Sequence, residues 1–335
     1  MPIICEDYNG SAKSAAYFTV DKFMYAYPQP NPLTPLGSEY QFSKQFLPTR
    51  FKKYMEQIEN FQVRPDDVWS VTFAKAGSTW SQEMIWLLNN NLNFEKAKKR
   101  SLQDRFPYLE FDACAELMNS KLLKKAKHMP SPRHLKSHLS AGLLPKQVWT
   151  VKPKIIYVAR GVKDLAISYY HHYVHMQGYK GTMEDFLEAF LEDKIFLAPY
   201  HGHVKDFHFL RNEENVLFIT YEEMKTDLMA VIKKTATFLG KCYSDEDLKK
   251  LEEHLTFDAM KNNKKVNFSK YLGYIKMYTR VTRAFSKNAN GKESWSFMRK
   301  GKIGSYKEEM PPEMIERFDN WTTEFNRKNG TFIPL

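Results

Sequence analysis

Residues 75–80 (KAGSTW) bring together the residue types that bind phosphate groups. They follow an apolar run typical of a strand, 68–74, and precede apolar residues at helical spacing. A turn from strand to helix directs unpaired N–H groups and the positive helix end at one point, where Gly77 allows close approach and Lys75 adds charge. A capped helix without a ligand is the alternative. ATP or GTP is disfavoured, because the spacing GxxxxGK[ST] is absent.

Lys136 and His138 form a second candidate pair. They lie two apart in residues 135–139 (LKSHL), and an extended conformation would place both side chains on one face. A histidine can take a proton from a hydroxyl near neutral pH. The alternative is a histidine with a purely structural role.

Arg160 follows the continuous apolar run 154–159 (KIIYVA), and Ser168 lies two turns into the next helical pattern. Ligands of open α/β sheets bind at the carboxyl ends of strands, so Arg160 is well placed for a phosphate. A surface salt bridge is the alternative.

Residues 297–301 (FMRKG) place a basic pair beside a glycine, which is weak as a signal because basic surface loops are common. Trp80 and Phe257 follow candidate anion sites and could stack on a purine ring, whereas most aromatic residues are core.

His171 and His175 are four apart on a predicted helix, as a pair of metal ligands would be. No HExxH pattern or positioned carboxylate accompanies them, so we expect no metal site. We expect these histidines, with His172, to pack near or line a pocket.

The composition restricts the class of protein. The 335 residues carry a net charge of +11, which suits nucleic acid, an acidic membrane or a small polyanion without choosing among them. The three cysteines are far apart, so neither a disulfide framework nor a structural zinc site is indicated. The sequence has no pattern of a secretory signal or membrane span, which predicts a cytoplasmic protein.

Strands alternate with helical patterns in the order expected of an α/β fold. Strands are predicted at 68–74, 154–159 and 215–221, and the helical pattern after the third ends near Gly240. This order predicts a mostly parallel sheet covered on both faces, in one domain spanning 1–335. Amphipathic helices are also predicted at 182–192 and 244–255.

Two segments lack such a pattern. Residues 1–60 are rich in Pro, Tyr and Phe and predict an irregular wrap that helps cover a pocket. Residues 261–305 are polar, basic and rich in turns, and predict a long loop covering the site.

Six segments, in order along the chain, are similar to motifs of the cytosolic sulfotransferases. The family's motifs YPKSGTTW, KTHLP, YVARNPKDVAVSYYHF, FLFYEDMK, SFxxMKxN and RKGxxGDW resemble residues 73–80, 136–140, 157–172, 218–225, 256–263 and 299–306.

The resemblance implies a sulfotransferase that moves a sulfuryl group from 3′-phosphoadenosine 5′-phosphosulfate (PAPS) to a hydroxyl or amine of a small apolar acceptor. It implies a P-loop-like phosphate site, His138 as general base, and Lys75 and Lys136 at the transferring group, without a metal. The implied cofactor-binding residues are Lys75, Ala76, Gly77, Ser78, Thr79, Trp80, Arg160, Ser168, Tyr221, Leu255, Thr256, Phe257, Met260, Phe297, Met298, Arg299, Lys300 and Gly301.

The chain departs from the family pattern at several positions. Ala76 replaces a serine, Ser78 replaces a threonine, and Tyr306 replaces a tryptophan. The family's dimer motif KxxxTVxxxE falls on 307–316, with Pro311-Pro312 in place of Thr-Val. The two prolines remove two backbone donors, so the sequence does not predict whether this chain forms the family's dimer.

Two other functions remain. The chain resembles the arthropod branch of the family, one member of which dehydrates retinol through a sulfated intermediate. A non-catalytic basic protein that binds nucleic acid or anionic lipid would also suit the charge, although no motif for either was found. Acceptor-lining residues are expected in the N-terminal segment and in 100–130, 171–205 and 264–295.

Overall fold

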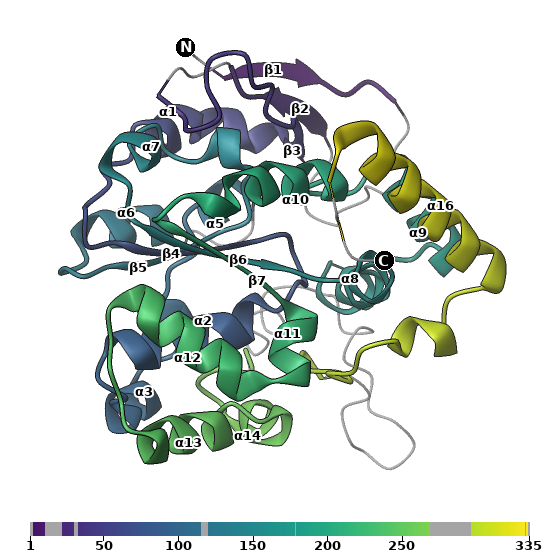
Figure 1. Ribbon diagram of the computed structural model, residues 1–335. Coiled ribbons are helices and arrows are strands. Elements are labelled where there is room, and N and C mark those ends of the chain that lie inside the picture. Colours follow the sequence, from purple (N-terminus) through teal and green to yellow (C-terminus); the bar gives the residue numbers. More distant parts are fainter. Residues whose placement is uncertain are drawn as a thin grey trace.

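A four-stranded parallel sheet forms the centre of the molecule (Figure 1). The computed structural model describes residues 3–10, 22–29, 33–114, 120–177, 179–268, 296–331 and 333. In the order across the sheet, the strands are β5 (His134–Ser137), β4 (Val68–Thr72), β6 (Lys154–Ala159) and β7 (Val216–Thr220). All three pairings are parallel, which confirms the predicted fold class.

Alternate residues of the strands enter two hydrophobic cores. On β4 and β6, Trp69 and Tyr157 belong to one core, whereas Val68, Ile156 and Val158 belong to the other. The side chains of a strand point alternately to its two faces, so a sheet covered on both sides needs apolar residues at successive positions. This requirement explains the continuous apolar run KIIYVA.

Helices cover both faces of the sheet. One face packs against α2 (Ser78–Asn89), α3 (Phe94–Lys99), α4 (Leu102–Arg105), α11 (Tyr221–Thr226), α12 (Leu228–Leu239), α13 (Asp245–His254) and α14 (Phe257–Asn262). The other core includes residues of α1 (Met55–Glu59), α5 (Phe111–Cys114), α6 (Leu122–His128), α7 (Val148–Val151), α8 (Val162–Gln177), α9 (Met183–Leu191), α10 (Tyr200–Phe209) and α16 (Pro312–Asn329). The structure also contains short 3-10 helices, which are η1 (Thr49–Lys53), η2 (Ala141–Leu143), η3 (Leu210–Asn212) and η5 (Ser305–Glu308).

The helical pattern after β7 is two helices rather than one. Asp227 lies between α11 and α12, and its side chain accepts a hydrogen bond from the Ala230 N–H, which caps α12. An aspartate at an N-cap favours a new helix start over continuation of the previous helix. Gly240 ends α12 with a φ of 70°, as predicted.

The N-terminal segment is more regular than predicted. It contains an antiparallel sheet of β1 (Ile4–Asp7), β2 (Phe23–Tyr27) and β3 (Gln45–Pro48). The expectation of an irregular segment was wrong here, because the strands are short and a proline-rich stretch separates two of them. The stacked rings of Phe23 and Phe46, with centroids 4.8 Å apart, hold β2 against β3.

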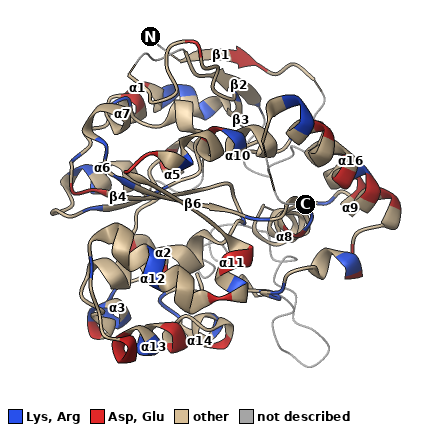
Figure 2. Cartoon of the chain, viewed as in Figure 1, with Lys and Arg blue, Asp and Glu red and all other residues tan. Residues whose placement is uncertain are grey.

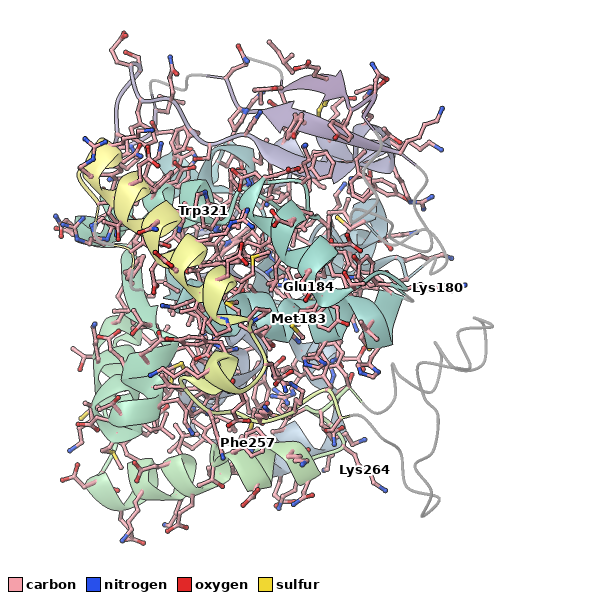
Figure 3. The ribbon with its side chains drawn as sticks, turned by 90° about the vertical axis from the view of Figure 1, so that its right-hand side faces the viewer. Lys180, Met183, Glu184, Phe257, Lys264 and Trp321 are labelled. Atoms are coloured by element: carbon pink, nitrogen blue, oxygen red, sulfur yellow. The ribbon has the colours of Figure 1, made fainter. Side chains whose placement is uncertain are left out.

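The chain closes with α16, which lies along α9 (Figure 3). The Trp321 ring lies 3.8 Å from that of His201 and 6.1 Å from that of Phe190, centroid to centroid. Pro311 and Pro312 occupy the N-cap and first position of α16, where a missing backbone N–H costs the helix no hydrogen bond. The predicted loop 261–305 includes residues 269–295, which lie outside the described residues. No described helix is long and apolar enough to cross a membrane.

Candidate active site

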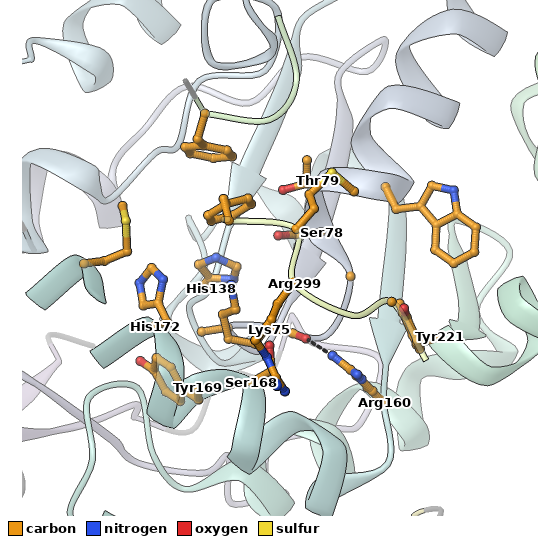
Figure 4. A pocket seen from close by; sticks show the side chains of 18 of the residues that line it. Lys75, Ser78, Thr79, His138, Arg160, Ser168, Tyr169, His172, Tyr221 and Arg299 are labelled. Atoms are coloured by element: carbon orange, nitrogen blue, oxygen red, sulfur yellow. Dashed lines mark hydrogen bonds between the residues drawn. The ribbon is translucent and has the colours of Figure 1, made fainter. Parts of the chain in front are cut away.

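A pocket of about 260 Å³ lies where the phosphate-type turn after β4 meets the segments that follow β5, β6 and β7 (Figure 4). Most of the predicted site residues line it, although they come from six separate segments. They are Lys75, Gly77, Ser78, Thr79, Trp80, Lys136, His138, Arg160, Ser168, Tyr221, Leu255, Phe257, Met260, Phe297, Met298, Arg299, Lys300 and Gly301.

Two predicted residues, Ala76 and Thr256, do not line the pocket. Ala76 is completely buried in the core that contains Trp69, so its methyl group packs against the protein interior. Thr256 is the N-cap of α14, and its side chain accepts a hydrogen bond from the Ala259 N–H. Neither side chain is therefore offered to a ligand in this pocket.

The turn after β4 is built for close contact with an anion. Gly77 has a φ of 108° and begins α2 without any side-chain hydrogen bond to the first turn. A Cβ atom on Gly77 would lie 2.9 Å from the Tyr221 ring, so only glycine fits beside this ring. The first N–H groups of α2 therefore lack a capping side chain, and they point where Ser78 and Thr79 line the pocket.

Six cationic side chains line the pocket, and no Asp or Glu is among its described lining residues. These cations are Lys75, Lys136, Arg160, Lys225, Arg299 and Lys300. Burial, reinforced by Arg160, Lys136 and Arg299, lowers the pKa of Lys75 to about 7. Burial lowers the pKa of Lys136 to about 8. Mutual repulsion of this kind is relieved when an anion enters.

Arg160 contacts both the phosphate-type turn and Tyr221. Its Nη1 donates a hydrogen bond to the Lys75 carbonyl oxygen at 3.1 Å, and its guanidinium lies 4.3 Å from the Tyr221 ring centroid (Figure 4). The buried Nε of Arg160 has no hydrogen-bond partner among the described residues. An unpaired buried donor of a charged group is costly, and an anion in the pocket would supply the partner.

Arg299 and Lys300 are engaged by two acidic residues of the following turn. Arg299 forms an ion pair with Glu309, and Lys300 contacts Glu308 and Glu309 at 2.7 Å each. Glu309 also accepts a hydrogen bond from His171 on α8. The hydrogen bonds from these three residues outweigh burial and bring the pKa of Glu309 to about 2. Glu309 thus ties the basic pair to α8.

Gly301 follows the basic pair, with a φ of 61°. A Cβ atom on it would lie 2.2 Å from the Phe257 ring. Its backbone therefore passes directly against this ring, which a side chain would prevent.

His138 is held in one tautomer. Its Nδ1 lies 2.6 Å from the Thr72 carbonyl oxygen, which can only accept, so Nδ1 carries the proton. Nε2 is left with its lone pair. Burial and the charge of Lys136 hold the pKa of His138 well below its usual range, so the ring is neutral and can take a proton.

The segment that carries His138 is held from both sides. Buried Glu110 accepts hydrogen bonds from the backbone N–H of His138 and from Ser137 Oγ, and burial raises the pKa of Glu110 to about 7. From the N-terminal sheet, Gln45 donates to the His138 carbonyl oxygen at 2.8 Å. The N-terminal segment thus positions the site, although none of residues 3–10, 22–29 and 33–60 lines the pocket.

The pocket wall beyond His138 is aromatic, and most of its residues were not predicted individually from the sequence. The pocket residues missed individually fall into two groups. Within the segments expected for an acceptor lie Tyr108, Phe111, Met176, Gln177, Phe196, Leu197 and Phe268. Within the quoted family motifs, but not singled out there, lie Ala74, Tyr169, Lys225 and Ser305. Only the segment position could have indicated a residue of the first group, because aromatic residues are spread along the whole chain.

The other histidines of α8 do not form a ligand cluster. The rings of His171 and His175 are stacked with centroids 6.2 Å apart, and His171 is paired with Glu309. Over the described part of the chain, no group of three or more His, Cys, Asp or Glu residues is placed to hold a metal ion.

Known sulfotransferases resemble this chain in sequence and in structure. The model of the sulfotransferase domain family matches residues 65–330. Luciferin sulfotransferase of Photinus pyralis is 37% identical over 308 residues, 87% of this chain and 80% of that protein. Human sulfotransferase 1C2 is 36% identical over 265 residues, 78% of this chain and 84% of that protein.

Two solved structures extend the likeness. Retinol dehydratase in complex with androsterone and the inactive cofactor PAP has a TM-score of 0.80 and 26% identity, over 100% of this chain and 99% of that one. A mouse sulfotransferase complexed with PAP has a TM-score of 0.64 and 26% identity, over 86% of this chain and 94% of that one. With the family model covering most of its length, the chain belongs to the sulfotransferase family and is an enzyme of that class.

Proposed function

We propose that this enzyme transfers the sulfuryl group of PAPS to a hydroxyl of a small, largely apolar acceptor, with His138 as the general base. One observation carries the proposal. A pocket lined by six cations and no described acidic residue adjoins a neutral histidine whose Nε2 is free of a proton. The first feature suits a polyanionic donor, and the second suits removal of a proton from a hydroxyl.

The residues present fit a nucleotide with two separate phosphate groups. Ser78, Thr79 and the start of α2 would hold one phosphate beside Lys75. Arg160, whose buried Nε lacks a partner, would hold the other, together with Ser168 and Arg299. Trp80 and Phe257 line the same pocket and would stack on the adenine. The relatives complexed with PAP support this assignment.

The chain's own residues account for the chemistry. His138 Nε2 takes the proton of the acceptor hydroxyl while that oxygen bonds to sulfur and the bond from sulfur to the 5′-phosphate oxygen breaks. Lys75 and Lys136 stabilise the negative charge that develops on the leaving oxygen. The Thr72 carbonyl oxygen stabilises the resulting imidazolium through the Nδ1 proton. Positioning and charge therefore supply catalysis without a covalent intermediate.

The acceptor would be held by the aromatic wall. Tyr108 packs edge-on against the His138 ring, with centroids 5.1 Å apart, and Phe111, Met176 and Phe196 continue the wall. This wall favours a flat or elongated apolar molecule. The names of two relatives, which mention luciferin and retinol, suggest members for an acceptor panel.

A second candidate is dehydration of the acceptor after its sulfation. The structural match to retinol dehydratase, whose structure was solved in a complex with retinol and PAP, covers 100% of this chain and supports this second candidate. The alternative of a non-catalytic basic binder is set aside, because the chain belongs to a family of enzymes. Acidic and basic residues are also interspersed along α13 and α16 (Figure 2). Cytoplasmic location and oligomeric state stay predictions.

The test is a sulfation assay with the purified protein. Labelled PAPS is incubated with phenols, luciferin, androsterone and retinol, and sulfated products, PAP and anhydroretinol are quantified. Sulfated products are expected. Anhydroretinol as the main product from retinol would support the second candidate, and no consumption of PAPS with any acceptor would refute both.

A further inference from the structure

His172 faces the pocket from α8, on the side of His138 and away from Arg160 (Figure 4). It lines the same pocket as Lys75, Lys136 and His138. The family motif quoted above has phenylalanine here, so this chain has replaced an apolar ring with a polar one. Neither the donor site nor the general base needs this change.

The imidazole of His172 is unpaired within the described residues. Its Nδ1 is sealed from solvent without a hydrogen-bond partner. By contrast, both ring nitrogens of the neighbouring His203 have partners, the Tyr157 hydroxyl at 2.9 Å and the His138 carbonyl oxygen at 3.2 Å. Most buried histidines have hydrogen-bond partners. His201 also has an unpaired Nδ1, but its Nε2 contacts the Thr322 hydroxyl at 3.1 Å and it does not line the pocket. His172 therefore lines the pocket with unused hydrogen-bonding capacity in its ring.

The charge state of His172 defines what it can bind. Burial, with Lys75 and Lys136, holds its pKa well below the usual range, so the ring is neutral and offers one donor and one acceptor. A hydroxyl or a carbonyl on a ligand can satisfy it. A protonated amine is disfavoured, because the pocket has six cations and its described lining residues include no carboxylate to pair with an ammonium group.

We propose that His172 is a specificity-determining residue that hydrogen-bonds a second polar group, a hydroxyl or carbonyl, of an uncharged acceptor whose reacting hydroxyl lies at His138. The inference rests on the proposed function and narrows its substrate class. An apolar acceptor with a single hydroxyl places that hydroxyl at His138, so it would cover the ring of His172 without giving it a hydrogen-bond partner. An acceptor with a second polar group would satisfy it, so the site selects difunctional molecules.

The test compares acceptors that differ only in the second group. kcat/KM is measured with PAPS for 2-naphthol and for 2,3-, 2,6- and 2,7-dihydroxynaphthalene, because the position of the second hydroxyl selects the one that reaches His172. The wild-type enzyme should prefer at least one diol to 2-naphthol by about tenfold, as expected for one hydrogen bond. His172→Phe should remove that preference, which is read as the ratio of kcat/KM for each diol to kcat/KM for 2-naphthol in the same variant. His172→Gln should retain part of the preference.

Controls separate this inference from the proposed function. His175→Phe changes the same helix one turn away, outside the pocket lining, and should leave the preference intact. PAP-induced thermal stabilisation, measured for every variant, reports an intact donor site. If the wild type sulfates all four naphthols without preference, or if His172→Phe slows all four equally, the inference is wrong although the proposed function stands. If none is sulfated and PAPS is not consumed with any acceptor, the proposed function itself has failed.

Discussion

The two ends of the pocket differ in how they are built. The proposed donor end, around Arg160, Trp80 and Tyr221, is formed mainly by short segments that follow strands, and residues 297–301 complete it. Glycines stand where the backbone comes close to a ring. The acceptor end, around Tyr108, His172 and Phe196, is formed by segments far from any strand end in the sequence. The donor end is cationic and the acceptor end is mainly aromatic.

This difference shows which demands are strict. Phosphate groups must meet unpaired N–H groups and cations at a fixed place, and the carboxyl edge of a parallel sheet provides that place. An apolar acceptor only needs a wall of suitable shape, which many combinations of aromatic residues can form. The donor end therefore carries recognisable motifs, whereas the acceptor end is free to vary.

The largest expected effect comes from removing His138, the proposed general base, which lies where the two ends meet. His138→Ala should lower kcat by about 10²- to 10⁴-fold, because no proton acceptor then faces the hydroxyl. PAP affinity, measured by calorimetry, should stay within about threefold. His128→Ala, at an exposed position, is the control. Full activity of His138→Ala would assign the base elsewhere.

A substitution that closes the donor end should be the next largest. Gly301→Ala places a Cβ atom against the Phe257 ring and should weaken PAP binding by about 30-fold. Gly304→Ala is the matched control, since Gly304 also has a positive φ of 75° but nothing lies within 4 Å of its added Cβ. Equal losses in both variants would point to backbone strain rather than contact with the ring.

The cationic cluster predicts a pH dependence that the aromatic wall does not. The pKa of Lys75 is about 7 in the free protein, and a bound anion raises it, so binding takes up a proton above that pH. PAP affinity should therefore be nearly constant below about pH 6 and fall by about tenfold from pH 7 to 8.5. Calorimetry in buffers of different ionisation enthalpy measures the proton uptake. Affinity that rises with pH would contradict the assignment.

The smallest effect concerns Glu309, which competes with an incoming phosphate for Arg299 and Lys300. Glu309→Gln removes the competing charge and should tighten PAP binding by about threefold. Glu308→Gln should change it by less than twofold, because the ion pair of Glu308 is largely exposed. Weaker binding in Glu309→Gln would mean that Glu309 positions the basic pair rather than competes for it.

The ion pair itself should persist in acid. The pKa of Glu309 is lowered from 4.5 to about 2, so its contribution to stability is complete above about pH 5 and is lost as the pH falls towards 2. Thermal denaturation of the wild type and Glu309→Gln between pH 2 and 7 measures this. Their melting temperatures should converge at the lowest pH.

By itself, the sequence determined the parallel sheet and the phosphate-type turn, and its resemblance to a known family indicated most of the proposed donor end. Apolar runs such as KIIYVA indicate strands buried on both faces, and Gly77 and Arg160 follow directly from strand ends. These features depend on neighbours in the chain, so local patterns suffice to find them.

Only the tertiary structure decided the rest. The tautomer of His138 depends on the Thr72 carbonyl, 66 residues away in the sequence. Gln45 reaches His138 from a sheet that was not predicted, and Glu309 reaches His171 across 138 residues. Hydrogen bonds and packing between distant segments leave no periodic trace in a sequence. For the same reason, the unpaired ring of His172 became visible only once the chain was folded.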